Sequence, residues 1–473
     1  MLITAPTCNS ESLSNLDWYQ RVQVVTSPGI RLERLSGKWK LIFNNKEVTF
    51  NLPEGTVTDI FSHLADGGCP LKDLAHAIQS DRSDFLQKQI HRLWSEGHIS
   101  QVLIGEDGVA ASFTSVGASS FLPSFPDLSQ GYSWSSTAYI RAVSSWVMLE
   151  TAESGATIAL NPHYKSLVNF VVQCAELCTP GTSLFVSTQD ETLMLTAWLL
   201  DSGFLKRTDI GYEENQAGLC FADKLIHARS RRGRHLGGYG ATHRMDGCLR
   251  SAPAVPPPAS GEKITLPKPD LDALCRNDPP FAAVVEGRRS ARFHGEKPID
   301  RRALGEFLYR VARVRQIQNG GDYEVAIRPY PSGGALYSVD IYVLVNLCLD
   351  IPKGLYRYDG VYHQLEKISN FNQDAQRLLD ESVSTSGATT EPNTLLVLAA
   401  RFHRVTWKYE SITYALILKE VGVIYQTMYL VATAMNLAAC ALGGGSASLF
   451  GKLSGKAFWE ESSVGEFLLG AQR

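Results

Sequence analysis

The sequence lacks a charge excess of either sign, a paired-cysteine motif and a long apolar run. Its 45 lysines and arginines nearly balance 48 acidic residues, which gives a formal net charge of -3. A dedicated nucleic-acid binder usually carries a marked basic excess, so this balance disfavours that class. The nine cysteines form no CxxC pair. We therefore predict no metal site, and we expect reduced thiols in a cytoplasmic protein.

Segment 414–440 is the most hydrophobic part of the chain, but Lys419, Glu420, Gln426 and Asn436 interrupt it. A membrane span needs about 18 or more apolar residues, so this segment predicts a buried helix and no membrane partner. The N-terminus has no basic region before an apolar core, and we expect no secretion signal. The 473 residues, 44% of them hydrophobic, suffice for about two to four globular domains.

The clearest break in the chain is the proline-rich stretch 251–262. Few of its side chains are apolar, so it predicts an extended linker that joins no core. It belongs to a longer segment, 224–263, that is rich in arginine and glycine before it becomes rich in proline. We therefore predict a C-terminal domain over 264–473.

The region before this linker is predicted to contain two similar modules, 1–125 and 126–223. In the first module, the patterns predict strands at 21–26, 39–43, 47–50 and 99–104 and helices at 71–78 and 84–94. In the second, a predicted helix over 188–201 stops at Gly203 and a strand begins at Phe204. Segments 93–99 and 199–205 align by eye. Strands, helices and a closing strand, found twice, predict two winged-helix-like modules.

Winged helices often bind DNA, but the charge of the first module argues against a nucleic-acid partner. Between Asp59 and Ser100 there are six acidic and four basic side chains, and a helix that faces phosphates is not expected to be net acidic. We favour capture of an extended peptide by strand addition at a sheet edge. A purely structural role stays open.

The segment from Lys224 to Arg250 is the one basic part of the chain, with seven basic residues against Asp246. Its stretch 227–240 is rich in glycine as well as arginine, which predicts a loop. The loop is either a solvated surface or a clamp for an anionic group or an acidic peptide.

Two groups of residues in the C-terminal domain have the chemistry of anion or ring binding. An apolar helix over 281–287 is followed by Arg288, Arg289, Ser290 and Arg292, whose guanidinium groups suit a phosphate or an electron-rich ring edge. A solvated basic turn is the alternative. Glycine-rich turns let backbone N–H groups approach a ligand closely, and two of them contain Pro331, Ser332 and Gly333, and Gly443 and Gly444.

Lys408 and Tyr409 are neighbours near the end of a predicted central strand, 394–400. Such a pair suits general base and acid chemistry if burial shifts the pKa values of both groups toward neutrality. Two adjacent ionisable residues are a weak signal when taken alone.

Taken in order, these motifs resemble the SagB-type dehydrogenases of the nitroreductase-like flavoprotein superfamily. Arg-Arg-Ser-Ala-Arg-Phe at 288–293 resembles the first flavin-binding motif, Pro-Ser-Gly-Gly at 331–334 the second, and Lys408-Tyr409 the Lys-Tyr pair of azoline dehydrogenases. The resemblance covers about 224 to 473. The whole layout, with modules before an oxidase domain, is most similar to the stand-alone cyanobactin thiazoline oxidases.

The resemblance implies an α+β fold in which helices wrap a central, mostly antiparallel sheet and FMN binds at the interface of a homodimer. It matches Arg288, Ser290 and Arg292 to the FMN phosphate, ribityl chain and pyrimidine edge, with Arg289 in the same motif. It matches Pro331, Ser332 and Gly333 to a turn reaching the flavin from the partner subunit, Gly443 and Gly444 to the backbone near N5, and Lys408 and Tyr409 to the catalytic pair. The chain ends at Arg473 without the usual run of bases, so Lys452, Lys456 and Arg473 all stay open as the phosphate base.

The implied activity is FMN-dependent oxidation of thiazolines, with oxazolines as a second option, in ribosomally made peptides. Oxygen then reoxidises the flavin, and the N-terminal modules recognise the peptide or its leader. Three alternatives remain: an NAD(P)H-dependent nitroreductase or quinone reductase, a non-catalytic peptide-binding scaffold, and a winged-helix regulator with a flavin sensor, which the charge disfavours.

Overall fold

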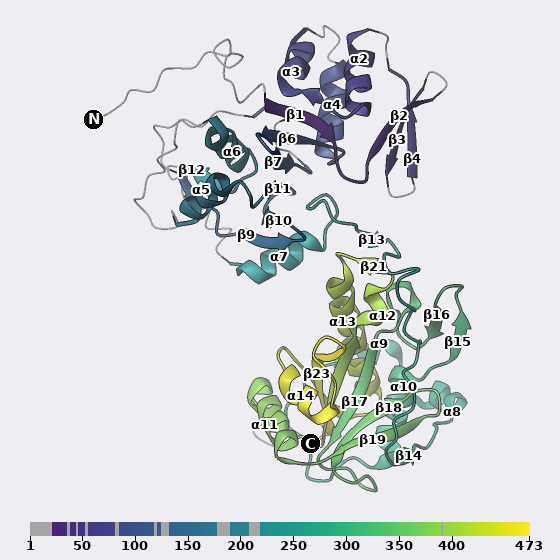
Figure 1. The fold of residues 1–473 in the computed structure, drawn as a ribbon. Helices are drawn as coiled ribbons and strands as arrows, with labels where there is room; N and C mark the ends of the chain where they lie inside the picture. The colour runs from purple at the N-terminus through teal and green to yellow at the C-terminus, as the bar shows by residue number, and fades with distance from the viewer. Residues whose placement is uncertain are drawn as a thin grey trace. The chain divides into compact units, whose positions relative to one another are not determined.

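The computed structural model describes residues 21–35, 38–43, 46–52, 55–80, 85–117, 121–123, 132–176, 190–207, 218–388 and 391–473. The chain forms two compact units, Met1–Gly237 and Gly238–Arg473. In Figure 1 the first unit runs from purple to teal and the second from teal to yellow.

The N-terminal unit is built on one seven-stranded sheet with the order β5-β1-β6-β7-β11-β10-β9. Its strands are β1 (Val22–Thr26), β5 (Cys69–Pro70), β6 (Ile99–Gly105), β7 (Gly108–Thr114), β9 (Ala138–Val143), β10 (Trp146–Thr151) and β11 (Thr157–Leu160). Two smaller sheets contain β2 (Arg31–Leu35), β3 (Lys38–Phe43) and β4 (Lys46–Phe50), and β8 (Tyr132–Trp134) with β12 (Leu205–Arg207). The helices are α2 (Thr56–Ala65), α3 (Leu71–Ser80), α4 (Phe85–Ser95), α5 (Lys165–Glu176), α6 (Asp190–Asp201) and α7 (Phe221–Arg229).

The helices predicted at 71–78, 84–94 and 188–201 are confirmed as α3, α4 and α6 within the described residues. The two segments that align by eye also share a backbone conformation. Gly97 follows α4 with a φ of 74°, and Gly203 follows α6 with a φ of 78°. This left-handed conformation ends a helix and suits glycine, and a strand follows in both cases.

The two predicted N-terminal modules share one sheet and one core. β7 of the first half pairs with β11 of the second. The Trp94 and Trp198 rings both pack against Phe113, with ring centroids 5.1 Å and 5.6 Å away. The Trp198 indole also donates a hydrogen bond of 2.8 Å to Gln101. The halves are therefore one packed unit, and their assignment as winged-helix modules stays a prediction.

The arginine-rich segment differs from the predicted loop, because its first residues belong to α7 and its bases are used internally. Arg229 lies 2.8 Å from the buried Glu150 carboxylate, which also pairs with Arg141. Burial alone would raise the pKa of Glu150, but hydrogen bonds from both arginines outweigh it and hold that pKa below its ordinary value. Arg234 donates to the Glu153 carbonyl oxygen at 2.9 Å. These two bases thus anchor the segment to the N-terminal unit.

The C-terminal unit is built on a seven-stranded sheet, β14-β19-β18-β17-β20-β23-β22, in which every pairing is antiparallel. The strands are β14 (Lys263–Thr265), β17 (Val339–Val345), β18 (Gly354–Asp359), β19 (Gln364–Asn370), β20 (Thr394–Arg401), β22 (Leu437–Leu442) and β23 (Glu461–Ala471). Smaller pairs are β13 (Gly240–Ala241) with β21 (Tyr409–Glu410), and β15 (Gln316–Asn319) with β16 (Glu324–Ile327). The predicted antiparallel centre of the domain is confirmed.

Helices cover both faces of this sheet, and a buried apolar cluster lies on each face. The helices are α8 (Leu271–Asn277), α9 (Phe281–Gly287), α10 (Arg301–Ala312), the 3-10 turn η3 (Gly333–Ala335), α11 (Gln373–Ser386), α12 (Phe402–Thr406), α13 (Thr413–Ala434) and α14 (Ala447–Ser454). Figure 1 shows α11 and α14 together on one side of the sheet. β17 and β20 are apolar runs because side chains on both of their faces are buried.

α13 is the helix predicted from the hydrophobic segment 414–440. By length and composition alone it could cross a membrane, and it is the single such helix among the described residues. The buried helix of a globular core passes the same test. α13 packs against α9, α10, β22 and β23, but only 33% of its apolar window is buried. The predicted helix is confirmed, whereas its full burial is not.

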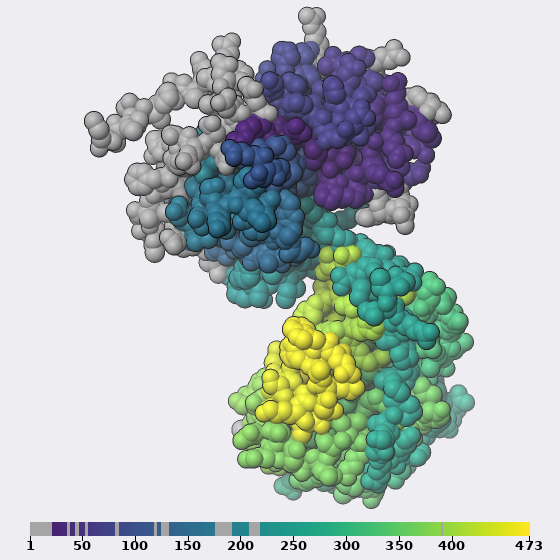
Figure 2. All heavy atoms as spheres, in the orientation of Figure 1, coloured from purple at the N-terminus to yellow at the C-terminus, as the bar shows by residue number. Residues whose placement is uncertain are grey.

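The proline-rich stretch is attached to the C-terminal unit and differs from the predicted free linker. Arg401 donates to the carbonyl oxygens of Pro253 and Ala254 at 2.7 Å and 3.0 Å, and Arg357 donates to that of Pro257 at 2.6 Å. The Ala254 side chain is fully buried. Proline lacks an N–H donor but keeps its carbonyl acceptor, so arginine donors hold a segment that has few apolar side chains. We call residues 238–259 the strap; the teal residues around 250 lie on the surface of the green unit in Figure 2.

A buried carboxyl group lies beside an ion pair at one end of the sheet. Arg401 Nε is 2.8 Å from Asp340 Oδ2, and Glu461, opposite Arg401 on β23, is 2% exposed. Burial, with a smaller contribution from the Asp340 charge, raises the pKa of Glu461 to about 7. The folded state therefore binds more protons than the unfolded state between about pH 4.5 and pH 7. Stability falls as the pH rises through that window.

We predict that Glu461→Gln removes this pH dependence, because glutamine does not ionise. Between pH 5 and pH 8 the native C-terminal unit should lose up to about 3 kcal/mol more stability than the variant. Hydrogen exchange of the β17 and β20 amides in the full chain, corrected for intrinsic rates, measures this loss. Glu460→Gln, at a carboxylate 63% exposed, is the control. An equal loss in native protein and Glu461→Gln would contradict the assignment.

Candidate functional site

The structure brings the predicted Lys408–Tyr409 pair against the predicted turn at Pro331–Gly333. A Cβ added at Gly334 would lie 2.7 Å from Tyr409 Oη and 3.1 Å from Lys408 Nζ. Gly334 also has a φ of 63°, which favours glycine. The next glycine of the motif is therefore the residue that lets the turn touch the pair. Lys408 and Tyr409 are both half-buried, so a ligand can reach them.

Glu420 of α13 holds this turn from its buried side. The Ser332 and Ser338 hydroxyl groups donate to Glu420 Oε2 at 2.9 Å and 3.3 Å, and the Tyr337 N–H donates to Ser332 Oγ at 3.0 Å. Burial raises the pKa of Glu420. The predicted Ser332 thus shapes the turn through its side chain, whereas Pro331 and Gly333 are exposed at its surface.

Tyr323 is a contact of Lys408 that the sequence does not indicate. Lys408 Nζ donates to Tyr323 Oη at 2.5 Å and lies 4.5 Å from the centre of the Tyr323 ring. It lies 5.5 Å from the centre of the Tyr409 ring. Tyr323 is the last loop residue before β16 in the β15–β16 hairpin, and no motif or periodicity marks a tyrosine at such a position.

Arg404 connects three segments around the pair. Its guanidinium group is fully buried and donates to the carbonyl oxygens of Leu336, at 2.9 Å, and Ala252, at 2.7 Å. It also donates to the carbonyl oxygen of Glu324. Burial, and next the Arg401 charge, lowers the pKa of Arg404 to about 10, so the group stays cationic at neutral pH. The turn, the strap and the hairpin that carries Tyr323 are thus held by one side chain.

The predicted arginine motif lies at another place, near the C-terminal end of α13. Ser290 Oγ and Tyr429 Oη share a hydrogen bond of 2.8 Å, and the Arg288 guanidinium lies 5.2 Å from the centre of the Tyr429 ring. Arg289 and Arg292 are exposed. Over the described part of the chain, none of these three arginines forms an ion pair with a carboxylate. Their charges are therefore available to an anion.

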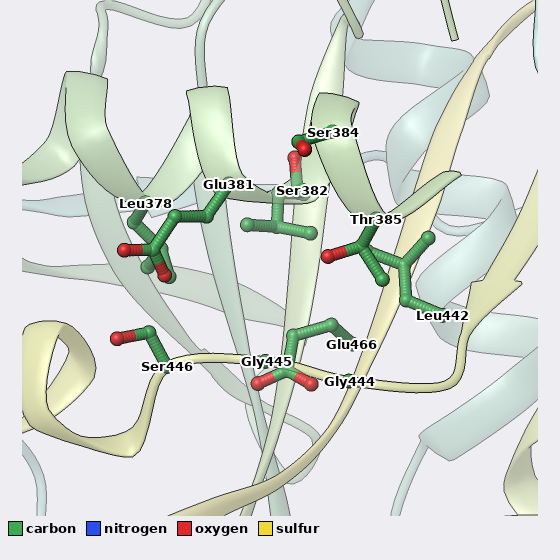
Figure 3. Close-up of a pocket in the computed structure, with 11 residues that line it drawn as sticks. Leu378, Glu381, Ser382, Ser384, Thr385, Leu442, Gly444, Gly445, Ser446 and Glu466 are labelled. Atoms are coloured by element: carbon green, nitrogen blue, oxygen red, sulfur yellow. The ribbon is translucent and has the colours of Figure 1, made fainter. Parts of the chain in front are cut away.

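Gly443 and Gly444 follow β22 and form an open stretch of backbone. A Cβ at Gly443 would meet nothing within 4 Å. Gly444 lines a cavity of about 210 Å³ beside α11, and Figure 3 shows the Glu466 carboxylate lying against Gly445 in that cavity. Burial raises the pKa of Glu466. Tyr425 of α13 ties the loop down, because it accepts from the Glu466 N–H at 2.7 Å and donates to the Leu442 carbonyl oxygen at 3.4 Å.

α13 thus connects all the predicted motifs, but on two of its faces. Glu420 holds the turn that touches Lys408–Tyr409, and Tyr429 holds the arginine motif. At 100° and 1.5 Å per residue, these two contacts lie about 180° apart around the helix and ~14 Å apart along it. One copy of the domain therefore presents two separate groups of site residues.

The structure also separates the three bases considered for a phosphate. Lys452 and Lys456 belong to or follow α14, which packs with α11, and Lys456 pairs with Glu460 at 3.2 Å. Arg473 lines a cavity of about 890 Å³ together with residues 293–300, directly after Arg292. The Gly295 N–H donates to the Ala471 carbonyl oxygen at 3.0 Å, which fixes the chain end there. Arg473 is the base that lies beside the arginine motif.

With this geometry in place, the chain matches one protein family. A model described as "Nitroreductase family" matches residues 285–464, which include the arginine motif, the turn, the Lys408–Tyr409 pair and the glycine loop. The match covers less than half of the chain, and over these residues it indicates a nitroreductase-like domain of the oxidoreductase class.

Two relatives carry the comparison further. A protein of Methanocaldococcus jannaschii named as a nitroreductase is 26% identical over 191 residues, which are 39% of this chain and 85% of that protein. The microcin B17-processing protein McbC of Escherichia coli is 33% identical over 116 residues. That second match spans 23% of this chain and 42% of McbC, less than half of its length.

Solved structures of low similarity are also found. The Escherichia coli microcin synthetase McbBCD complex with truncated pro-MccB17 bound has 22% identity and a TM-score of 0.33, covering 40% of this chain and 73% of that one. A nitroreductase from Ralstonia eutropha has 22% identity and a TM-score of 0.36, covering 48% of this chain and 98% of that one.

We predict that Arg404→Met destabilises the C-terminal unit by roughly 3–6 kcal/mol. Methionine retains most of the volume but leaves three carbonyl oxygens, one of them buried, without their charged donor. Thermal and urea unfolding of the full chain, with hydrogen exchange of β20, measures the change. Arg377→Met, at a side chain 57% exposed, should alter stability by less than about 0.5 kcal/mol. Equal stability of the two variants would refute the role of Arg404.

Proposed function

We propose that this protein is an FMN-dependent azoline oxidase acting on ribosomally made peptides. Its substrates are thiazolines, with oxazolines as a second class, and its products are the aromatic thiazoles and oxazoles. The observation that carries the proposal is the contact of Lys408–Tyr409 with the Pro331–Gly334 turn inside a nitroreductase-family domain. The similarity to McbC, a processing protein of microcin B17, supports a peptide substrate.

The residues present fit FMN. A phosphate needs cationic donors, and Arg288, Arg289 and Arg292 have no carboxylate partner among the described residues, while Arg473 lies beside them. A flat ring needs backbone free of side chains, as at Gly443 and Gly444. In this assignment Arg288, Ser290 and Arg292 hold the phosphate, ribityl chain and pyrimidine edge, as the family resemblance suggests.

We propose a homodimer because the two groups of site residues lie on opposite faces of α13. A single flavin cannot contact both opposite faces of one helix, so the turn and Lys408–Tyr409 of one copy would complete the site of another. The exposed stripe of α13 is apolar enough for such a contact: Tyr414 and Leu418 are both 43% exposed. Phe281 of α9, which packs on α13, is 74% exposed. The proposed dimer would cover these exposed apolar side chains.

In the proposed reaction, the azoline ring loses a proton and a hydride and becomes aromatic. FMN held by these residues would supply the hydride acceptor, with oxygen as the final oxidant. Lys408 Nζ or Tyr409 Oη takes the proton from the ring carbon. The backbone of the turn at Gly334 and the ring of Tyr323 limit where Lys408 Nζ can lie, so they orient the base toward the substrate.

The N-terminal unit is proposed to bind the peptide or its leader. Strand addition needs a sheet edge with free backbone groups, and β2, β4 and β9 are edge strands in the sheet orders of this unit. β9 is partly exposed along its whole length.

The alternative is an NAD(P)H-dependent nitroreductase, which the relative from Methanocaldococcus jannaschii favours. It uses the same cofactor residues but gives no role to the N-terminal unit.

We predict that a thiazoline-bearing peptide, added without oxygen, bleaches the visible flavin band of the purified protein. The hydride leaves the substrate and has no acceptor other than the cofactor. Visible absorbance in an anaerobic cuvette is the measurement, and the matching thiazole peptide is the control. A band that stays yellow with the peptide but bleaches with NADPH would move the assignment to a reductase.

We predict that the double variant Lys408→Leu and Tyr409→Phe loses turnover by at least about 1,000-fold while FMN stays bound, because both proton acceptors are gone. Flavin absorbance per chain and peptide oxidation by mass spectrometry measure the two properties. Lys419→Leu, at an exposed lysine of α13, is the control. Full activity in the double variant would remove the pair from the mechanism.

A further inference from the structure

We propose that Tyr323 is a positioning residue that holds the Lys408 amine in place against the Pro331–Gly334 turn. This inference deepens the proposed function and rests on it, because it concerns the pair assigned to proton transfer. It starts from the contact of Lys408 Nζ with the Tyr323 hydroxyl and ring, at 2.5 Å and 4.5 Å. The arginine motif and the glycine loop do not take part in it.

The hydrogen-bond partner of the Lys408 amine is a neutral hydroxyl group and not a carboxylate. Over the described residues, no carboxylate pairs with Lys408, so its charge is held by a neutral hydroxyl and an aromatic face. A carboxylate accepts hydrogen bonds and cannot donate one, whereas a tyrosine hydroxyl does both. Tyr323 can therefore accept from the ammonium form of Lys408 and donate to the neutral amine. The hydrogen bond between Tyr323 and Lys408 can therefore persist in both protonation states of the amine. This suits a residue that gains and loses a proton during the reaction.

Tyr323 is itself fixed by the residues around it. The carboxylate of the next residue, Glu324, accepts from the Ala254 N–H of the strap at 2.9 Å, and the Glu324 carbonyl oxygen accepts from Arg404. The Trp407 and His243 rings pack against Tyr323, with centroids 5.7 Å and 6.2 Å away. A lysine side chain is flexible, so a rigid partner is what gives its amine a defined place.

The strap adds a second restraint, on the backbone at Lys408. The His243 N–H donates to the Lys408 carbonyl oxygen at 3.0 Å, and β13 of the strap pairs with β21. The backbone of Lys408 is thus fixed by the strap and its amine by Tyr323. Gly334 then closes the remaining side, since a Cβ there would reach Nζ at 3.1 Å.

The first test requires neither substrate nor turnover. The full chain is labelled with a trace of acetic anhydride, and mass spectrometry gives the acetylation rate of Lys408 relative to the exposed Lys419. A restrained, hydrogen-bonded amine reacts slowly. Tyr323→Phe, which removes only the hydroxyl, should raise the ratio at least about 3-fold, and Tyr323→Ala should raise it further. Tyr362→Phe, at a tyrosine 66% exposed, should leave it unchanged.

The second test measures the reaction. With a thiazoline peptide under anaerobic conditions, Tyr323→Phe should lower the limiting rate of flavin reduction at least about 10-fold. The FMN content and the peptide concentration giving half the maximal rate should stay within about 2-fold of the native values. The dependence of the rate on pH, recorded from pH 6 to pH 10, should change shape, since the partner of the proton acceptor has been removed.

The outcomes separate this inference from the proposed function. If neither the acetylation ratio nor the reduction rate responds to Tyr323→Phe while the native flavin is bleached by the peptide, the inference fails and the function stands. If the ratio responds but no thiazoline peptide reduces the native flavin, the contact is real and the proposed function fails. A loss of rate in Tyr362→Phe equal to that in Tyr323→Phe would also overturn the inference.

Discussion

The site of this protein depends on one buried cation. Arg404 is fully enclosed in the C-terminal unit, close before Lys408 in the chain, and its guanidinium fork donates to carbonyl oxygens of the strap, the β15–β16 hairpin and the turn before β17. Each of these three segments then touches Lys408 or Tyr409 from its own side. A rigid group with five donors suits this arrangement, because one side chain meets several acceptors at fixed angles. A flexible lysine would not fix three segments in the same way.

α13 provides the second constraint. One of its faces supports the turn through Glu420, and the opposite face supports the arginine motif through Tyr429. A straight helix cannot bring opposite faces together, so the two groups stay apart within one copy of the chain. In the proposed dimer, the turn and the Lys408–Tyr409 pair of one copy would meet the arginine motif of the other copy. It also gives a reason for the exposed apolar stripe on a helix that is otherwise part of the core.

The N-terminal unit is held together by contacts of its arginine-rich segment and by packing between its two halves. Two bases of its arginine-rich segment contact the Glu150 carboxylate and the Glu153 carbonyl oxygen. The segment therefore has less free positive charge for an anionic partner than its sequence indicates. Trp94 and Trp198, one from each half, pack on a common phenylalanine. The two halves were predicted as modules, yet they form one unit because their sheets join at β7 and β11. Peptide binding by this unit remains a proposal.

The sequence by itself determined the local elements and the family of the C-terminal domain. α3, α4 and α6 follow from helical patterns, α13 from a hydrophobic segment and β20 from an apolar run. The ordered motifs from Arg288 to Gly444 indicated the nitroreductase-like domain. Only the tertiary structure decided that the strap belongs to the domain, that Arg404 and Tyr323 support the pair, and that the motifs form two groups. The reason is physical. Helix caps and periodic burial are written in neighbouring residues, whereas a hydrogen bond from a buried side chain to a distant backbone carbonyl leaves no pattern in the sequence.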